Sequence, residues 1–384
     1  MLLLLPFLGQ GQKLKLSDQA EISILTCGPG AALDALFGHN AIRIYDPVWG
    51  IDATYGYGGF DFSTPNFYLK FTQGKLMYEA DKIDFNRFVQ GYRNENRWIY
   101  EQVLDLDSLS KQEIFEFVEW NILPENKKYK YDFFFDNCAT KMRDIVHDVV
   151  GADLIFSGDY LTRPNTFRDL LREMNGVMPW ISLGMDIALG APIDPKATPE
   201  EHMFLPNYVL SGFDNAVVMK NGSAIPAVKS ERMIFQPVAA DSKKGLMTPM
   251  VIFSVLMLLV LGITYKDYKT KHRSKTLDFL LFLISGLVGV LVILLWTATE
   301  HAGMRNNLNV LWAFAPNLVV AFFMLKANPP KWVRAYARLL FILLIMMALV
   351  WVFGIQIYST ALIPLVLLFG ARYFFLWQRG LMKT

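Results

Sequence analysis

The chain has 384 residues, of which 53% are hydrophobic and 14% aromatic, and its formal net charge is +2. This length suffices for two domains, the hydrophobic content is too high for an ordinary soluble protein, and the small net charge gives no reason to expect nucleic acid as a partner. Two cysteines cannot form a disulfide framework, and no cysteine and histidine cluster has zinc-ligand spacing, so we expect no metal and no other cofactor.

The first residues, "MLLLLPFLGQGQ", are apolar and are followed by small and polar residues. They resemble the hydrophobic part of a signal peptide, although no basic residues precede them. We assign residues 1–18 to this segment. The alternative is an apolar terminus with no targeting role.

Two neighbouring segments predict a β-hairpin after a first strand, "AEISILTCGPG". "HNAIRIYDP" alternates polar and apolar residues, "DPVWG" is a turn, and the Tyr- and Gly-rich "IDATYGYGGFDF" is the partner strand. If the hairpin turns about Val48, His39 lies opposite Tyr57.

Near residue 110 the hydrophobic period changes to that of a helix. Ser110 and Glu113 predict a capping box ahead of "IFEFVEWNIL", and "YDFFFDNCATKMRD", residues 131–144, predicts a second helix capped by Asp136 or Asn137. Residues 220–245 predict edge strands and a linker. The segment 19–245 is therefore predicted to be an α+β domain with a small antiparallel sheet and helices beside it.

The remaining residues, 246–384, contain five apolar runs near the length that spans a bilayer. We place these five spans at 247–265, 277–298, 309–326, 335–353 and 356–376.

Positive charges are unevenly distributed among the loops between these runs, because the second and fourth loops have almost none. The first, third and last segments carry the basic residues Lys266, Lys269, Lys271, Arg273, Lys275, Lys326, Lys331, Arg334, Arg379 and Lys383. By the positive-inside rule these segments are cytoplasmic. We therefore expect a multi-pass protein of the inner membrane, with the 19–245 domain exported to the periplasm and the C-terminus in the cytoplasm.

Cys138 falls in the first turn of its predicted helix. Free backbone N–H groups and the helix dipole stabilise a thiolate at such a position, and a thiolate is a nucleophile. His147 lies too far along the same helix to act as its base, which leaves His39 and His202, and His39 at the start of a strand is better placed. The alternatives are a buried structural cysteine and a disulfide to Cys27.

These motifs resemble a known family. "GHNAIRI", the Tyr-Gly-rich strand and "YDFFFDNCATKMRD" are similar to the exported domain, domain of unknown function 4105, of bacterial lipoprotein N-acyltransferases. That domain looks like a circularly permuted papain-like, or NlpC/P60-like, fold, in which the histidine precedes the cysteine, as in lecithin:retinol acyltransferase. The resemblance covers residues 20 to about 215, including "RPNTFRDLL" and "LGAPIDPKATPEEHMFLPNYVL", and the five-span tail also fits.

The resemblance implies that Cys138 carries the acyl chain and that His39 is its base. Permuted relatives carry a second histidine on the next strand, and this chain has none in residues 40–146. We therefore take Tyr57, opposite His39 in the predicted hairpin, as the first choice and Asp52, which is on the other face unless a bulge shifts it, as the second.

Five residues are candidates for lipid contacts. Arg43 shares a strand face with His39, Asn137 precedes the nucleophile, and His301, Arg305 and Asn307 lie in the predicted outward loop "TEHAGMRNN". The alternatives are an ordinary surface arginine and a solvated loop.

A cysteine and histidine pair supports acyl transfer through a thioester, and five spans suit lipid substrates. The expected function is N-acylation, in which an acyl chain moves from a phospholipid donor to the α-amino group of a diacylglyceryl-lipoprotein acceptor. A cell-envelope cysteine amidase or peptidase and a non-catalytic membrane sensor are the alternatives.

Overall fold

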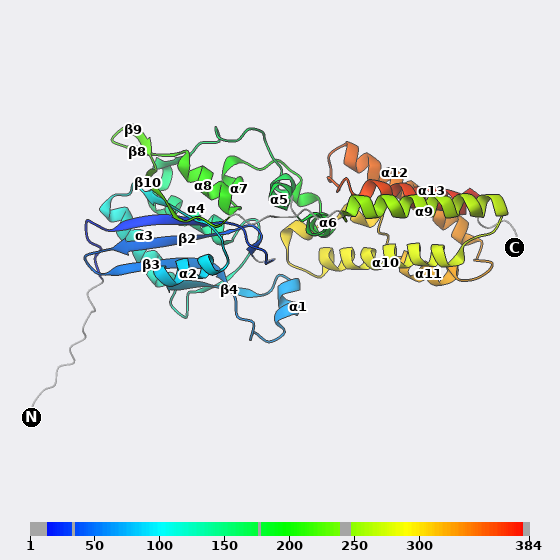
Figure 1. Ribbon diagram of the computed structural model, residues 1–384, viewed down its shortest axis with the longest axis horizontal. Helices are drawn as coiled ribbons and strands as arrows, with labels where there is room; N and C mark the ends of the chain where they lie inside the picture. The colour runs from blue at the N-terminus through cyan, green and yellow to red at the C-terminus, as the bar shows by residue number, and fades with distance from the viewer. Residues whose placement is uncertain (1–13, 33–34, 176–177, 239–246, 379–384) are drawn as a thin grey trace, which may run out of the picture.

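The computed structural model describes residues 14–32, 35–175, 178–238 and 247–378. It has two parts, a mixed domain of strands and helices and a bundle of apolar helices (Figure 1). Most of the predicted signal-peptide segment, and the linker residues 239–246, lie outside the described residues.

A seven-stranded antiparallel sheet forms the framework of the first part, with strand order β10-β5-β1-β2-β3-β4-β6. The predicted hairpin is its centre, formed by β2 and β3. The edge strand predicted after residue 220 is also present as β10. The seven strands are β1 Glu21–Cys27, β2 His39–Asp46, β3 Ile51–Gly59, β4 Met77–Asp84, β5 Ile99–Leu104, β6 Lys128–Lys130 and β10 Val228–Phe235.

The register of the hairpin differs from our prediction by one residue. Ala41 pairs with Gly56, so Asn40 rather than His39 aligns with Tyr57. A shift of one residue moves every side chain of a strand to the other face of the sheet. Tyr55 and Tyr57 therefore lie on the face opposite His39.

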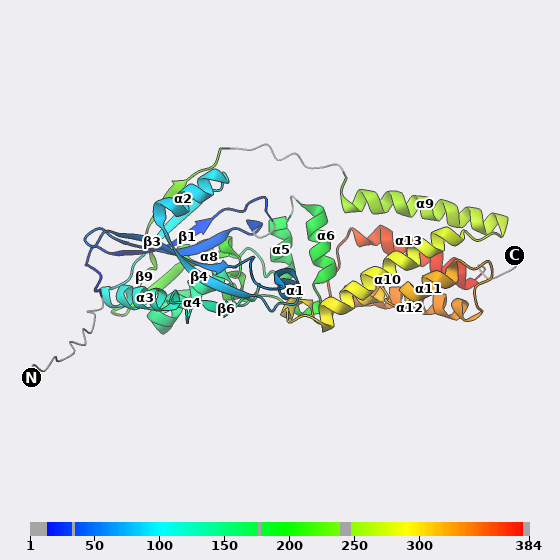
Figure 2. The ribbon, with the colours of Figure 1, turned by 90° about the horizontal axis from the view of Figure 1, so that it is seen from below.

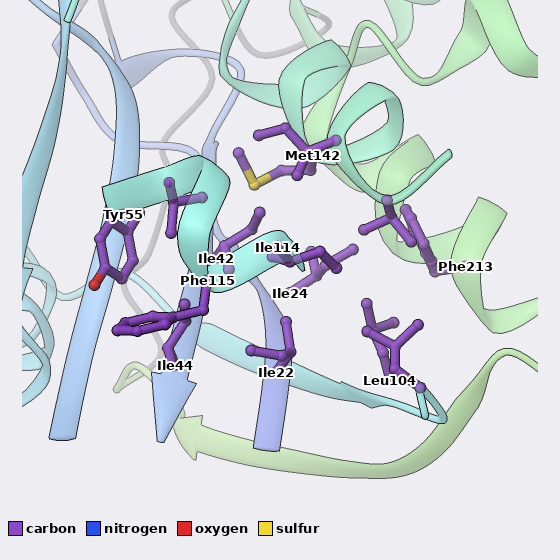
Figure 3. Packing of buried hydrophobic residues seen from close by; sticks show 14 of the residues in the cluster. Ile22, Ile24, Ile42, Ile44, Tyr55, Leu104, Ile114, Phe115, Met142 and Phe213 are labelled. Atoms are coloured by element: carbon purple, nitrogen blue, oxygen red, sulfur yellow. The ribbon is translucent and has the colours of Figure 1, made fainter. Parts of the chain in front are cut away.

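One face of the sheet carries the main core (Figure 3). Four isoleucines of β1 and β2 are fully buried there, and each contributes about 2 kcal/mol through removal from water. Three helices cover this face: α3 (Ser108–Asn121), α4 (Cys138–Val150) and α8 (Pro206–Asp214). The helix α3 begins earlier than the predicted capping box, because Asp107 caps it by accepting from the N–H of Ser110.

The opposite face of the sheet is covered by α2 (Phe85–Asn94). A second, three-stranded sheet consists of β7 Leu154–Phe156, β8 Ala216–Lys220 and β9 Ser223–Pro226. The remaining helices of this part are α1 Phe67–Thr72, α5 Phe167–Asn175, α6 Pro179–Ala188 and α7 Pro199–His202, with 3-10 turns at Gly151–Asp153 and Ala191–Ile193.

Three helices in the described residues are long and apolar enough to cross a membrane. They are α9 (Pro249–Thr270), α10 (Lys275–Thr297) and α12 (Trp332–Val352), and α13 (Leu362–Gln378) is a shorter apolar helix. These four confirm the positions of four predicted apolar runs. Large side chains such as Leu258 and Leu287 are exposed on them, as expected for surfaces that contact lipid.

The third predicted span, 309–326, is not one continuous helix. It consists of a 3-10 turn, Leu308–Leu311, and the eight-residue helix α11, Asn317–Met324. Pro316 separates the two, and it has no N–H to continue a helix. Gly286 and Gly289 of α10 leave no room for a Cβ, so this segment packs directly on the backbone of α10.

Buried polar groups connect the two parts of the protein. After α10, Asn307 donates to the carbonyls of Ile187 and Ala188 at the end of α6, and Asn309 donates to the carbonyl of Asp186. Arg168 of α5, itself almost fully buried, pairs with Asp186 from the other side. The first domain is thus attached to the periplasm-facing loop that our topology assigns after α10.

Candidate active site

Cys138 is the first residue of α4, as the sequence predicted, and Asn137 fixes its position. The Asn137 side-chain oxygen accepts from the N–H groups of Ala139 at 2.7 Å and Thr140 at 2.9 Å. Its amide donates to the carbonyls of Phe133 at 2.7 Å and Phe204 at 2.9 Å. Asn137 is therefore a helix cap whose side-chain oxygen and nitrogen are both bonded to the backbone. We remove it from the candidates for lipid contacts.

The Cys138 thiol is protonated at neutral pH. Burial raises its pKa to about 11, and the backbone N–H groups of Asn40, Cys138 and Ala139 offset only part of this effect. Desolvation outweighs the N–H groups, so this environment does not favour the resting thiolate that we expected at the helix terminus. Those N–H groups are directed at the sulfur, so they can also stabilise an oxyanion formed beside it.

His39 begins β2 and lies at the same end of the sheet as Cys138. The sulfur interacts with the N–H of Asn40, the residue directly after His39. Burial lowers the pKa of His39 to about 4, and the Arg97 guanidinium lowers it further. The imidazole is therefore neutral at pH 7 and able to accept a proton.

No hydrogen bond between the His39 and Cys138 side chains is found among the described residues. The sulfur lies near the backbone of β2, but the His39 side chain is on the face of the sheet opposite α4, with Cys27 and Ala41. The contact between the imidazole and the thiol that we expected from the packing of the sheet on the helix therefore remains a prediction.

Both cysteines are free, so the disulfide alternative does not hold. Cys27 is fully buried opposite His39 on β1, and burial raises the pKa of its thiol. His202 is also fully buried, and its Nδ1 is 2.7 Å from the carbonyl oxygen of Thr198 within α7. Cys27 and His202 are therefore packed inside the protein, as structural residues are.

Neither of the two sequence candidates for the third residue is positioned to orient His39. Tyr57 points into the main core, where its hydroxyl donates to Asn121 at 2.7 Å. Asp52 does share the face of His39, but it aligns with Tyr45, about 20 Å along the strand. Its carboxylate pairs with Arg43 instead.

Asp81 of β4, a residue that the sequence analysis did not single out, lies near His39. It aligns with Gly56 of β3, and a Cβ built on Gly56 would lie 2.7 Å from Asp81 Oδ1 and 3.6 Å from His39 Nε2. The glycine in the middle strand therefore leaves a gap that His39 and Asp81 flank. Partial burial raises the pKa of Asp81, while the Gly56 N–H and Lys127 lower it. In the sequence, the sign of this pair is Gly56, a glycine in the strand between the two strands that carry His39 and Asp81.

Arg43 is not available for a phosphate. It is nearly buried, and its guanidinium pairs with Asp52 at 2.8 Å and Glu101 at 3.0 Å. The same group lies 3.5 Å from the centre of the Phe85 ring. The alternation of β2 showed correctly that Arg43 shares the face of His39, but only the fold shows that acidic neighbours occupy it.

The three candidates in the loop after α10 have different environments. Asn307 is fully buried in the junction with α6, and His301 Nε2 is 3.2 Å from the carbonyl oxygen of Phe71. The Arg305 side chain is exposed. Arg305 is the member of this trio whose side chain is accessible.

The same loop contacts the segment that leads into α4. A Cβ at Gly303 would lie 2.5 Å from the ring of Phe134, so this glycine packs closely against that ring. Phe134 follows Phe133, whose carbonyl holds the Asn137 cap. The cysteine helix therefore starts beside the end of a membrane helix.

Two protein-family models match the chain. The model described as Lnb N-terminal periplasmic domain matches residues 13–173, and the model described as Lnb transmembrane domain matches residues 241–380. The first match contains both His39 and Cys138. No curated protein and no solved structure matches the chain.

Proposed function

The chain belongs to the Lnb family of membrane proteins with a periplasmic domain and a transmembrane domain, and from that premise we propose that it is a lipoprotein N-acyltransferase. The donor is a phospholipid, and the acceptor is the α-amino group of a diacylglyceryl-modified cysteine at a lipoprotein N-terminus. A histidine strand that precedes a cysteine helix supports a permuted papain-like arrangement.

In the first step, the Cys138 sulfur attacks the carbonyl carbon of a phospholipid ester while His39 accepts the thiol proton. With the thiol pKa raised to about 11 and the imidazole pKa lowered to about 4, the proton stays on sulfur at rest and passes to His39 only as the sulfur attacks the ester. The tetrahedral intermediate expels the lysophospholipid alkoxide, which takes the proton from His39, and a thioester remains on Cys138.

In the second step, the uncharged amine of the lipoprotein attacks the thioester carbonyl. His39 accepts a proton from the amine and returns it to the departing sulfur, so that an amide forms and the Cys138 thiol is restored. The N–H groups of Asn40 and Cys138 are the proposed oxyanion donors in both steps, because the Ala139 N–H is bonded to Asn137. Asp81 is proposed to orient His39 across the gap at Gly56.

The observation that carries this proposal is the position of the nucleophile. Gly303, in the loop after α10, packs on Phe134 in the segment that leads into α4, and this contact supports a position of Cys138 close to the membrane boundary. A soluble cell-wall amidase has no need for such a site or for several membrane helices. Donor and acceptor lipids both reside at that boundary.

We also propose five crossings of the membrane, with the end of α13 in the cytoplasm. Arg273, before α10, donates to the carbonyls of Met324 and Lys326, and Arg372 of α13 pairs with Asp267 of α9 and Asp278 of α10. At the other end of the bundle, Gln356 accepts from the N–H of Leu308. These contacts support the 309–326 segment as a crossing despite its interrupted helix.

Fusion reporters test this topology. A reporter that is active only outside the cytoplasm should work near residue 303 and fail near residue 270 or after Thr384. The reverse pattern would place Cys138 in the cytoplasm and would overturn the assignment.

The reaction is tested by intact mass spectrometry of a lipoprotein N-terminus from cells with and without this protein. We expect one added acyl mass only when the protein is present. An unchanged mass together with cleavage of cell-wall peptides would favour a cysteine amidase or peptidase. An unchanged mass with no acyl adduct on Cys138 and no cleavage would favour a non-catalytic sensor.

A further inference from the structure

A group of apolar side chains is exposed on α1 and the loop before it. Phe62 is 68% exposed, Tyr68 77% and Leu69 58%. Together with Phe71, which is 50% exposed, and Phe67, which is buried and contacts the surrounding rings, we call these residues the aromatic platform. Their rings contact one another, with centroids 4.8 Å apart for Phe62 and Phe67 and 6.2 Å apart for Phe67 and Phe71. A contiguous apolar surface of this kind is rare on a soluble domain and marks an interaction site.

The platform is fixed beside the end of a membrane helix. Directly after α1, the carbonyl of Gln73 accepts from the N–H of Glu300 at 2.8 Å, and His301 contacts both the Phe71 carbonyl and Gly74. Glu300 and His301 follow α10 by a few residues. Two perpendicular views show α1 next to this end of α10 (Figures 1 and 2).

We propose that the aromatic platform inserts into the outer surface of the lipid bilayer that surrounds the helix bundle. Aromatic side chains favour the interface between headgroups and acyl chains. Lys70 lies among the platform residues and Lys75 is exposed just after them, so their ammonium groups can reach lipid phosphates. The contacts of Glu300 and His301 hold the platform beside the end of α10, whose large apolar side chains are exposed, and this position argues for lipid rather than a protein as its occupant.

The platform also leads toward the nucleophile. Phe67 contacts Phe60 with ring centroids 5.7 Å apart, Phe60 contacts Tyr78 at 5.7 Å, and Tyr78 stacks on Tyr131 at 4.4 Å. Burial is the main cause of the raised pKa of the Tyr131 phenol, and Cys138 is close enough to be the next cause. This row of rings forms an apolar wall from the bilayer to Cys138 along which an acyl chain can move, a consequence that rests on the proposed acyl transfer.

Membrane insertion is tested without reference to activity. The full chain carrying Cys27→Ser and Cys138→Ser is spin-labelled at Tyr68→Cys and reconstituted in nanodiscs of phosphatidylethanolamine and phosphatidylglycerol. Val48→Cys is the matched control, because Val48 is 55% exposed in the turn at the other end of β2. The label at 68 should collide more with oxygen than with a water-soluble nickel chelate, and the label at 48 should show the opposite. Equal accessibility at the two positions would overturn the proposal.

A second measurement uses the catalytically intact chain with Phe62→Ser and Tyr68→Ser together. Thioester formation from bilayer phospholipid should fall at least about tenfold more than formation from a short-chain, water-soluble phospholipid, whereas Val48→Ser should change neither. Equal losses with both donors would contradict a membrane role. If the unmodified protein forms no thioester from either donor, the proposed enzyme function fails, and the spin-label result still decides whether the platform inserts.

Discussion

The two ends of strand β2 carry polar side chains on the same face of the sheet, yet their surroundings differ. At one end, Arg43 is nearly buried and forms ion pairs with Asp52 and Glu101. At the other end, His39 has no ion pair within the described residues, and burial makes its charged form unfavourable. One end is an electrostatically complete network, and the other holds a neutral imidazole beside the gap at Gly56.

This difference separates structural from reactive polar groups. A buried charge is tolerated when its partners satisfy it, and such a group has little capacity left for a substrate. A buried group without a charged partner shifts its pKa toward the neutral form and remains available for a substrate or a proton. The predictions below test this contrast.

The largest expected effect is that of Cys138→Ser. A hydroxyl at this position ionises far less readily than a thiol, so the trapped acyl-enzyme should fall about a thousandfold or more while the fold is retained. Mass spectrometry of the intact protein after incubation with phospholipid measures this loss. Cys27→Ser is the matched control and should retain the adduct, since Cys27 is buried in the sheet.

His39→Ala comes next, with an expected loss of about a hundredfold in thioester formation, because proton transfer is removed. His202→Ala serves as the control and should form the thioester normally per folded molecule, even if it is less stable. Equal losses in the two variants would remove His39 from its role as base.

The pH dependence of the rate of thioester formation tests His39 through its pKa, in the acid limb where the rate falls at low pH. The imidazole accepts protons only above its pKa, so activity should be retained down to about pH 4 and lost below it. A limb near the ordinary histidine value of 6.5 would contradict the neutral, buried base. Folding is affected in the same direction, because the unfolded chain binds the proton more readily, so stability should decline as pH falls from 6.5 toward 4.

Arg43→Gln should lower the free energy of unfolding by about 3 kcal/mol, because Glu101 and Asp52 would keep their charges without a partner. Thermal unfolding followed by circular dichroism measures this change. Thioester formation per folded molecule should remain normal. A stable variant with lost activity would return Arg43 to the substrate-binding residues.

The smallest expected effect is that of Asp81→Asn, about a tenfold loss, since the residue orients His39 without transferring a proton. Removal of the nearby carboxylate should also move the acid limb to lower pH, which a purely structural role would not do. Gly56→Ala should resemble this variant, because its methyl group would lie 2.7 Å from Asp81 Oδ1. Gly91→Ala is the control, as nothing lies within 4 Å of a Cβ there.

Local signals in the sequence were sufficient for several features. The alternating pattern of residues 39–46 predicted a strand, and the Asp-Asn-Cys motif predicted a helix that starts at Cys138. Four of the five apolar runs correspond to helices, and the motifs around His39 and Cys138 indicated the family that the two family models identify. Each of these features depends on residues close together in the chain, so composition and periodicity could reveal it.

Tertiary structure decided the rest. The turn at residues 46–51 set a register one residue away from the predicted one, and that single step removed Tyr57 from the face of His39. The side chains that surround a group determine its protonation and its freedom to bind substrate, and they come from distant parts of the chain. Burial therefore made Cys138 a thiol, Glu101 engaged Arg43 across the sheet, and Gly56 left the gap between His39 and Asp81, because desolvation and charge pairing act through space and not along the sequence.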